Sequence, residues 1–322
     1  MRELFSEYLS MDAVSISSNL LPRLGSGFNA RVHSVFDSSF NCLGRDGAFI
    51  TIADKRKGNV PNGILVNRPY GYTFESLGLK RDMLIKSSGS VLFFPETGIR
   101  ISLDKAGIWQ VQAKFNRELL SIDEIKANLL CVKKAARANS SKKGLGILLR
   151  YSGAILRGDV IEDDVLDYFN YLAFQSLSGL VKGIRARDFE VIEKTVSGLI
   201  GLGVGLTPSG DDVLLGIISG MSCLGHYSKE SDYILKISDL ISCRAKDKTT
   251  MVSQSYLQCA ARGEFSEALA DMLKAVLYSK GTEVSSSALK VIAVGSSSGQ
   301  EIVLGVLLGL ELGMELFDIG RN

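Results

Sequence analysis

The sequence has few of the residues that build zinc sites, disulfide frameworks and hydrolytic triads. Its five cysteines are scattered without a CxxC pair, and only two histidines are present. This composition argues against a structural zinc site and a disulfide framework, and it fits a reduced compartment. With so few histidines and no nucleophile motif, the sequence also argues against a Ser-His-Asp hydrolase.

A large excess of one charge and clean apolar runs are lacking as well. Lys plus Arg number 37 against 35 for Asp plus Glu, a net charge of +2, which gives no support to nucleic-acid or anionic-membrane binding. Acidic residues such as Asp211 and Glu311 interrupt the most apolar stretches, 199–226 and 299–318, so neither reads as a membrane span. The N-terminus lacks the apolar stretch of a signal peptide. We therefore expect a cytoplasmic protein with no nucleic-acid or membrane partner.

The hydrophobic period changes part-way along the chain. From about 32 to 112, short apolar runs alternate with turn residues, and 91–94, 99–103 and 108–111 read as a three-strand meander. After about 120 the pattern becomes helical, opening with the capping-box signature Ser121-Ile-Asp-Glu124. Since 322 residues fit two domains, we predict an α+β protein. A mainly β domain at 1–118, a small barrel or sandwich, precedes a helical domain at 119–322.

The most distinctive segment is Gly201-Leu-Gly-Val-Gly-Leu-Thr-Pro-Ser-Gly-Asp-Asp212, followed directly by a helical apolar pattern. Alternating glycines let main-chain N–H groups approach a ligand closely, and a helix N-terminus attracts anions. The pattern predicts a site for a small anionic metabolite. The residues expected to bind it here are Gly203, Gly205, Thr207, Ser209 and Gly210, with Asp211 and Asp212 as catalytic groups.

Two other interpretations of this segment stay open. The Asp pair beside hydroxyls could hold a hydrated magnesium ion, so Asp211 and Asp212 are also candidate metal ligands. Alternatively, Ser209 or Gly210 simply caps a helix and the two carboxylates complement its dipole. A cap alone leaves the three alternating glycines and the Thr-Pro pair without an explanation.

A related segment occurs near the C-terminus. Residues 209–220 align without gaps to 298–309, and Ser, three Gly and one Leu are identical. Glycines four residues apart share one helix face, which allows another backbone to come close. We predict a pair of helices whose N-termini converge, adding Ser298, Gly299 and Glu301 to the candidate binding residues. Common small-residue packing is the alternative.

A third candidate segment begins at Thr249-Thr-Met-Val-Ser253, where a further helix is expected to start. Thr249 is placed to cap this helix, and Ser253 follows one turn later on the same face. The hydroxyls of Thr249, Thr250 and Ser253 are therefore candidates for lining the site, and capping is the simpler alternative.

The long segment 201–216 resembles the hallmark of the AllH-like family, which includes the third subunit of oxamate carbamoyltransferase. Similarity extends to Val32-His-Ser-Val-Phe36, to Ala260-Ala-Arg-Gly263 and to the C-terminal Ser-Gly segment. The resemblance implies a subunit of an enzyme of allantoin (purine) nitrogen catabolism. That enzyme interconverts oxalurate plus phosphate with oxamate plus carbamoyl phosphate, and partner subunits are implied too.

The resemblance is incomplete near the C-terminus. The family pattern leads us to expect a His-Ser/Thr-Ser-Gly-Trp-Asp-like run, whereas this chain has Ser296-Ser-Ser-Gly-Gln-Glu301. Two further functions therefore remain open: a regulatory module that binds a small anion or nucleotide without turnover, and a magnesium-dependent enzyme acting on a phosphorylated metabolite.

Overall fold

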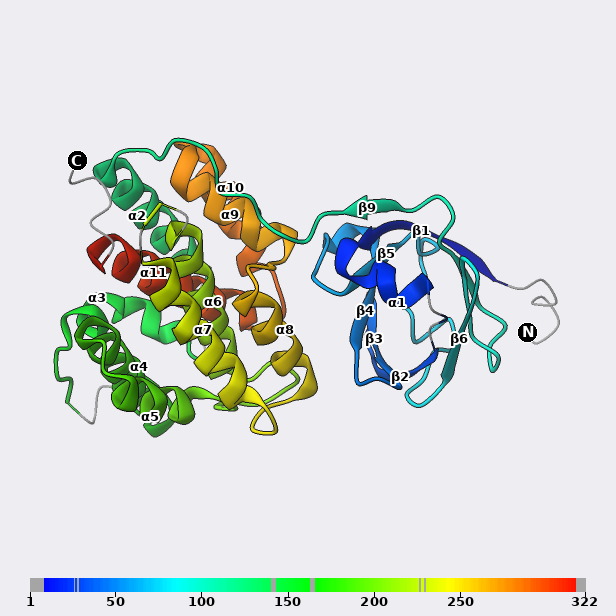
Figure 1. The fold of residues 1–322 in the computed structure, drawn as a ribbon, viewed down its shortest axis with the longest axis horizontal. Coiled ribbons are helices and arrows are strands. Elements are labelled where there is room, and N and C mark those ends of the chain that lie inside the picture. The colour runs from blue at the N-terminus through cyan, green and yellow to red at the C-terminus, as the bar shows by residue number, and fades with distance from the viewer. Residues whose placement is uncertain are drawn as a thin grey trace. The chain divides into compact units, whose positions relative to one another are not determined.

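The structure is a computed structural model that describes residues 9–25, 27, 29–139, 143–162, 166–225, 227–228 and 230–316. The chain divides into two compact units. The first comprises 1–112 with 265–267, and the second comprises 113–264 with 268–322. Figure 1 shows both units with most of their elements labelled. The α+β prediction is confirmed: strands form the first unit and helices the second.

The first unit is a closed β-barrel. Its strands are β1 (Ser10–Ser17), β2 (Asn29–Val35), β3 (Ser39–Gly44), β4 (Phe49–Asp54), β5 (Gly63–Val66), β6 (Leu84–Ser88), β7 (Val91–Phe93), β8 (Arg100–Ser102) and β9 (Gly107–Trp109), with a short helix α1 (Leu21–Gly25). The sheet order is β5-β4-β3-β2-β6-β7-β8-β1-β9, and β1 also pairs with β5, which closes the barrel. Closure removes the exposed sheet edges at which strands aggregate.

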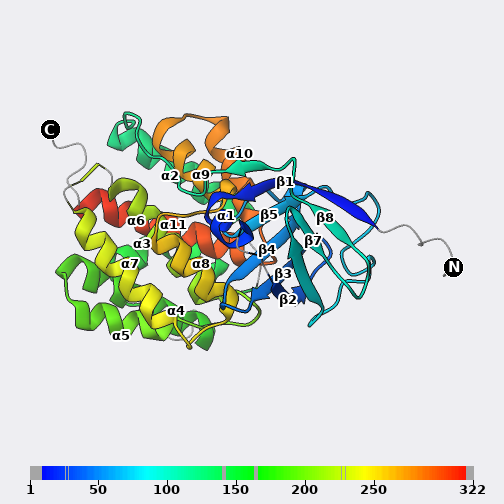
Figure 2. The same ribbon diagram turned by 45° about the vertical axis from the view of Figure 1, so that its right-hand side comes forward.

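One predicted strand pairing is wrong. β7 and β8 pair antiparallel as the meander requires, but β9 pairs with β1 in parallel instead of with β8. The meander is β6-β7-β8, since β6 pairs antiparallel with β7. β1 is long enough to pair with β8 through Ser10–Asp12 and with β9 through Ser15–Ser17. Figure 2 shows β1, β8 and β7 side by side.

Aromatic residues fill the barrel interior. Phe40 packs edge-on against Phe74 and Phe94, with ring centroids 5.0 and 5.7 Å apart, and all three side chains are fully buried. Buried residues of the strands belong to the same cluster, including Ile52 of β4 and Ile85 of β6. The edge-on geometry is the one that aromatic pairs prefer.

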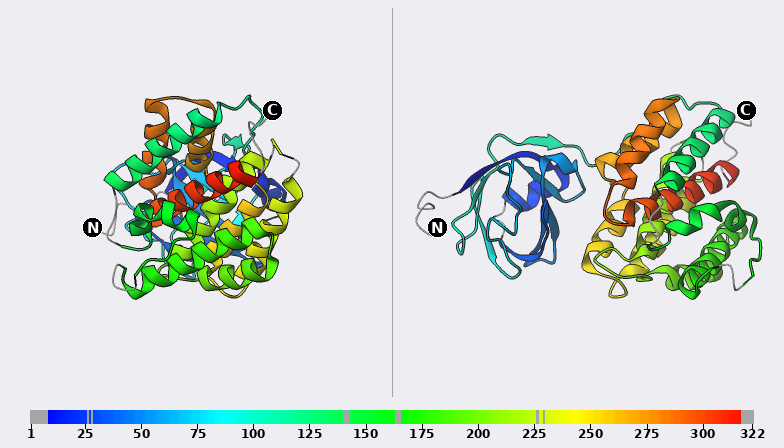
Figure 3. Two further views of the ribbon diagram at one scale, coloured as in Figure 1. Left: turned by 90° about the vertical axis from the view of Figure 1, so that its left-hand side faces the viewer. Right: turned by 180° about the vertical axis from the view of Figure 1, so that it is seen from behind.

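The second unit is helical. Its helices are α2 (Ile122–Ala138), α3 (Ser152–Arg157), α4 (Tyr168–Ala186), α5 (Phe189–Leu199), α6 (Ser209–Gly225), α7 (Ser231–Ala245), α8 (Met251–Ala261), α9 (Glu267–Tyr278), α10 (Thr282–Ile292) and α11 (Ser298–Leu316). The predicted capping box of Ser121 and Glu124 is present at α2. α11 packs on α6, α2, α3, α4 and α10, and it runs through the middle of this unit in Figure 3.

Helices α6 and α11 pack against each other in parallel through their glycines. A Cβ at Gly305 would lie 2.0 Å from the Val213 carbonyl oxygen and 2.8 Å from the Gly216 Cα. One turn later, a Cβ at Gly309 would lie 2.4 Å from the Ile217 carbonyl oxygen. Only glycine leaves room for backbones at this distance. The aligned segments therefore form one helix pair that starts at the same end.

Candidate functional site

The loop before α6 is held in backbone conformations that favour glycine. Gly201, Gly203 and Gly205 have φ angles of 73°, 123° and 97°. A Cβ at Gly203 would lie 2.7 Å from the Ser209 backbone nitrogen, whereas one at Gly205 would meet no atom within 4 Å. Gly203 thus brings the loop onto the first turn of α6. Both a left-handed φ and a close approach are needed there, and this explains the glycine.

The starts of α6 and α11 meet. The hydroxyls of Thr207 and Ser298 lie 3.0 Å apart, which joins the loop before α6 to the first residue of α11. The Ser298 hydroxyl also lies close enough to the Asp212 carboxyl of α6 to lower its pKa, and the Ser209 hydroxyl of α6 has the same effect on the Glu301 carboxyl of α11. Each helix therefore uses its first serine for the acid of the other helix. In an ordinary capping box, serine and acid belong to the same helix.

Two candidate glycines support this junction by packing. The Gly210 N–H donates to the Leu202 carbonyl at 2.8 Å, and the Gly299 N–H donates to the Val294 carbonyl at 3.0 Å. A Cβ at either residue would lie about 2 Å from a carbonyl oxygen, 2.0 Å at Gly210 and 2.1 Å at Gly299. The N–H groups of both glycines are thus used within the chain.

Asp211 anchors the glycine loop. It is 2% exposed, and its Oδ1 accepts a hydrogen bond from the Gly201 N–H at 3.0 Å. Its Oδ2 accepts one from the Thr249 hydroxyl. Burial raises the pKa of Asp211, while donors including Thr249 and the Gly201 N–H oppose that rise. Both carboxyl oxygens of this acid already have partners in the protein.

Asp212 lies in a different environment. It is 6% exposed, and its Oδ2 has no hydrogen-bond partner among the described residues. Burial raises its pKa well above the usual range, and the charges of Glu301 and Asp211 raise it further. The Ser298 and Thr207 hydroxyls act in the opposite direction. Asp212 is therefore a buried acid with one unsatisfied oxygen at the point where two positive helix ends converge.

Glu301, which aligns with Asp212, has more donors. It is fully buried, and its Oε1 accepts a hydrogen bond from the Leu145 N–H at 2.9 Å. The Ser297 hydroxyl donates to its Oε2 at 3.4 Å, in addition to the nearby Ser209 hydroxyl. Burial raises the pKa of Glu301, and these donors oppose the rise.

Sequence reasoning missed the loop that supplies the Leu145 N–H. A Cβ at Gly144, which has a φ of 67°, would lie 2.0 Å from Glu301 Oε1 and 3.1 Å from Ser209 Oγ. A Cβ at Gly146 would lie 2.4 Å from Oε1 of Gln300, where the family pattern led us to expect a ring. The closely spaced pair Gly144 and Gly146 was the available signal, because it resembles the spacing before α6.

Helix α8 contributes hydroxyls, but its expected cap is wrong. Thr250 is the N-cap, and its hydroxyl accepts a hydrogen bond from the Ser253 N–H at 3.1 Å. The Thr250 hydroxyl also donates to the Leu206 carbonyl in the glycine loop. Thr249 instead reaches Asp211, and the buried Ser253 hydroxyl lies close enough to lower the pKa of that acid. α8 thus holds the loop and Asp211 together.

The candidate metal ligands can be compared with the grouping of acidic, histidine and cysteine side chains in the structure. Over the described residues, no group of three or more His, Cys, Asp or Glu side chains is placed to hold a metal ion. The magnesium ligands Asp211 and Asp212 remain a prediction.

No helix in the described ranges is long and apolar enough to cross a bilayer.

A cavity of about 350 Å³ lies elsewhere in the helical unit, beside the C-terminal part of α11. Its lining includes Arg185 and Glu315, which form an ion pair with each other. The cavity brings together none of the candidate residues.

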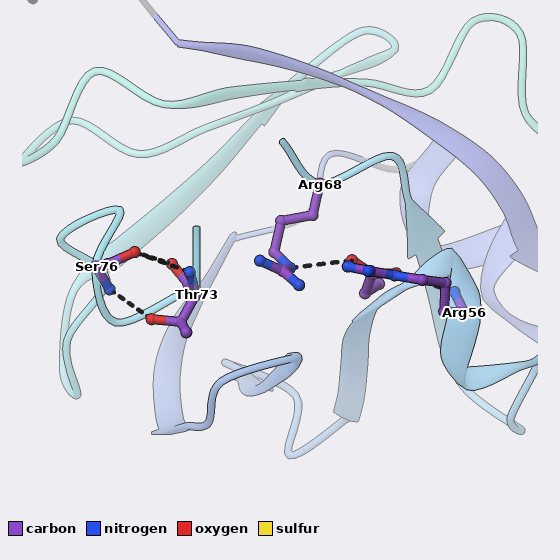
Figure 4. Close-up of polar contacts among 5 residues, drawn as sticks. Arg56, Arg68, Thr73 and Ser76 are labelled. Atoms are coloured by element: carbon purple, nitrogen blue, oxygen red, sulfur yellow. Dashed lines mark hydrogen bonds and ion pairs between the residues drawn. The ribbon is translucent and has the colours of Figure 1, made fainter. Parts of the chain in front are cut away.

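A second polar cluster lies in the barrel unit. Asp54, at the end of β4, is 2% exposed and pairs with Arg56 at 2.7 Å and with Arg68 at 3.0 Å. Hydrogen bonding to Arg56, with the charge of Arg68, lowers the pKa of Asp54 to about 2. Figure 4 shows Arg68 between Arg56 and the turn in which Thr73 and Ser76 bond each other. Both carboxyl oxygens of Asp54 have partners within the barrel unit, so the cluster reads as structural.

Comparison with known families finds a match within each unit. Residues 12–108 match the model of the AllH family N-terminal domain, and residues 199–310 match the model of oxamate carbamoyltransferase subunit AllH. The chain belongs to the AllH family. The second AllH match spans the glycine loop, α6, α8 and most of α11, and so includes every predicted site residue. No solved structure matches the chain.

Proposed function

We propose that this AllH-family chain is the substrate-binding component of a carbamoyltransferase that works with partner subunits. Its small anionic substrate binds where the N-termini of α6 and α11 converge, beside the loop of Gly203 and Gly205. The observation that carries the proposal is the junction itself, in which two parallel helices and a glycine-rich loop meet at one point. Family membership supplies the class of reaction.

The chemistry of the junction suits this reaction. Two helix N-termini place positive dipole ends close together, which favours a small anion such as oxamate or carbamoyl phosphate. Carbamoyl transfer needs orientation of the amide nucleophile and stabilisation of charge at the carbamoyl oxygen more than it needs a covalent intermediate. The Thr207, Ser209 and Ser298 hydroxyls lie at the junction and orient the substrate by exchanging their internal partners for it.

A thermal-shift screen of the purified full chain tests binding. The ligands are oxamate, carbamoyl phosphate, inorganic phosphate, nucleotides and Mg²⁺, each tested alone. A ligand at about 100 times its dissociation constant should stabilise the chain by roughly 2.7 kcal/mol. Ser298→Ala should reduce the shift. Ser121→Ala, which removes the cap of α2 outside the junction, should lower the melting temperature and leave the ligand shift intact.

Reconstitution tests the reaction. The chain is combined with its co-purifying partner subunits, and carbamoyl phosphate formation from oxalurate and phosphate is followed. Binding without turnover in the assembled complex would favour a regulatory module. Turnover of a phosphorylated metabolite by the single chain with Mg²⁺ would favour the metal-dependent alternative. A cytoplasmic location and the allantoin pathway stay predictions.

A further inference from the structure

Two acids in equivalent positions of α6 and α11 differ in one partner. The alignment of the two segments places Asp212 opposite Glu301, and the first serine of each helix lies beside the acid of the other helix and lowers its pKa. Glu301 also receives a main-chain amide N–H, from Leu145. Asp212 Oδ2 has no such donor among the described residues. The loop around Gly144 covers Glu301, so the two halves of the junction are not equivalent.

We infer that Asp212 Oδ2 accepts a hydrogen bond from the amide N–H of the substrate. The substrate N–H thus takes the place that the Leu145 N–H has at Glu301. This inference rests on the proposed function and makes Asp212 the residue that recognises the amide end of oxamate, the monoamide of a dicarboxylic acid. The carboxylate end of the same ligand then lies toward the N–H groups of the glycine loop.

The surroundings of Asp212 favour a neutral N–H donor at this oxygen. The charged groups that act on Asp212 are Glu301 and Asp211, both acidic, so a second carboxylate oxygen would be repelled. The loops packed against this site carry two basic residues, Lys143 next to Gly144 and Lys248 next to Thr249. Both side chains are exposed, and neither is among the groups that shift the pKa of Asp212. An oxygen this deeply buried without a donor loses its hydration, and an amide N–H of the ligand compensates for that loss.

The same contact suits the transfer step. A bond forms between the amide nitrogen and the carbamoyl carbon, and the carbon–oxygen bond to phosphate breaks. Phosphate leaves with the electron pair, and the amide proton passes to Asp212 Oδ2. In the reverse direction the Asp212 carboxyl returns that proton to the departing oxamate nitrogen.

Comparing oxamate with oxalate tests the inference, because oxalate replaces the amide by a second carboxylate. Affinities are measured by calorimetry on the full chain and on the complex with its partner subunits. We expect oxamate to bind at least about tenfold more tightly than oxalate. In Asp212→Asn, whose amide can turn either a donor or an acceptor toward the ligand, this ratio should fall to near one.

Two further variants separate amide recognition from loss of charge. Asp211→Asn removes the same charge one residue away, but the oxygens of Asp211 are held by Gly201 and Thr249. It should therefore change both affinities alike. Glu311→Gln, at a half-buried position farther along α11, should change neither affinity.

Each outcome decides the inference. Oxalate binding to the wild type as tightly as oxamate would overturn it, and this test needs no variant. If the complex turns over oxamate but Asp212→Asn keeps the wild-type ratio, the inference fails while the proposed function stands. If neither ligand binds the chain or the complex, both fail together.

Discussion

The two units of the chain bury acidic side chains in opposite ways. In the barrel, Asp54 lies between two arginines, and its pKa is lowered to about 2. In the helical unit, Asp212 and Glu301 lie together with no basic side chain among the groups that shift their pKa values, and burial raises both. A charge paired in place supports the fold, whereas a buried acid without a basic partner costs stability, and groups of this kind are concentrated at functional sites.

The largest effect on the free energy of unfolding should come from removing a basic partner of Asp54, because Asp212 and Glu301 have no such partner among the groups that shift their pKa values. Arg68→Met removes the buried partner of Asp54 and its contact with the Phe74 ring at 5.8 Å. We expect a loss of up to about 3 kcal/mol, because a buried hydrogen bond to a charged group is removed and Asp54 keeps only the more exposed Arg56 as its ion-pair partner. Trp109, the single tryptophan, lies in β9 and reports barrel unfolding in urea.

Arg23→Met is the matched control in the same unit. Arg23 and Asp46 form an exposed pair, with side chains 43% and 58% exposed. Removing an exposed pair costs less than about 1 kcal/mol. Equal losses in Arg68→Met and Arg23→Met would show that Arg68 does not support the buried charge, and the contrast between the units would lose its basis.

A second, smaller effect is the loss of barrel stability at low pH. Because the pKa of Asp54 is lower in the folded state, its stabilisation is present above its ordinary pKa, near 3.9, and is lost as the pH falls through about 2. The barrel should lose about 2 kcal/mol from this group between pH 5 and pH 2. The stability difference between wild type and Asp54→Asn, followed by Trp109 fluorescence, should shrink over the same range. A difference that does not vary with pH would exclude Asp54 as its source.

The overall architecture of both units was predictable from the sequence because it depends on local patterns. The change of hydrophobic period separated barrel from helices, and the capping box marked the start of α2. The similarity of 209–220 to 298–309 indicated that two helices pack together, because glycines four residues apart lie on one helix face. These signals involve residues close together in the chain.

Features that depend on tertiary contacts were not predictable in this way. β9 pairs with β1, which lies far away in the sequence. Thr250 caps α8, while the neighbouring Thr249 donates a hydrogen bond to Asp211. Similarly, the Ser-x-x-acid spacing at Ser209 and Ser298 suggests two separate caps, whereas the close helix contact makes each serine reach the other helix. The segment 265–267 belongs to the barrel unit, which no local pattern indicates.

A third prediction concerns the unpaired acid. A raised pKa in the folded state means that the penalty is absent below the ordinary pKa and grows as the pH rises toward the folded value. Asp212→Asn should therefore be more stable than the wild type by about 1 kcal/mol at pH 8. The gain should disappear as the pH falls toward 4. Far-UV circular dichroism, dominated by the helical unit, measures it, and a variant less stable than the wild type at pH 8 would contradict this account.

The smallest effect tests how the two helices share their serines. Ser298→Ala should lower the free energy of unfolding by about 1 kcal/mol or less. If Ser298 serves Asp212 across the pair, Ser298→Ala and Asp212→Asn should be coupled by at least about 0.5 kcal/mol in a double-mutant cycle. Ser298→Ala and Glu301→Gln should then be nearly additive. An ordinary capping box would give the reverse pattern, because Ser298 and Glu301 share one helix.

The same cycle at the other helix start completes the test. Ser209→Ala should couple to Glu301→Gln and not to Asp212→Asn. Its own cost should be smaller than that of Ser298→Ala, since Leu145 and Ser297 still donate to Glu301. Fewer donors act on Asp212: once Ser298 is removed, Thr207 is the one side-chain donor left beside its carboxyl among the described residues. Unequal costs with crossed couplings would establish that the two helix starts exchange partners but differ in how completely they are satisfied.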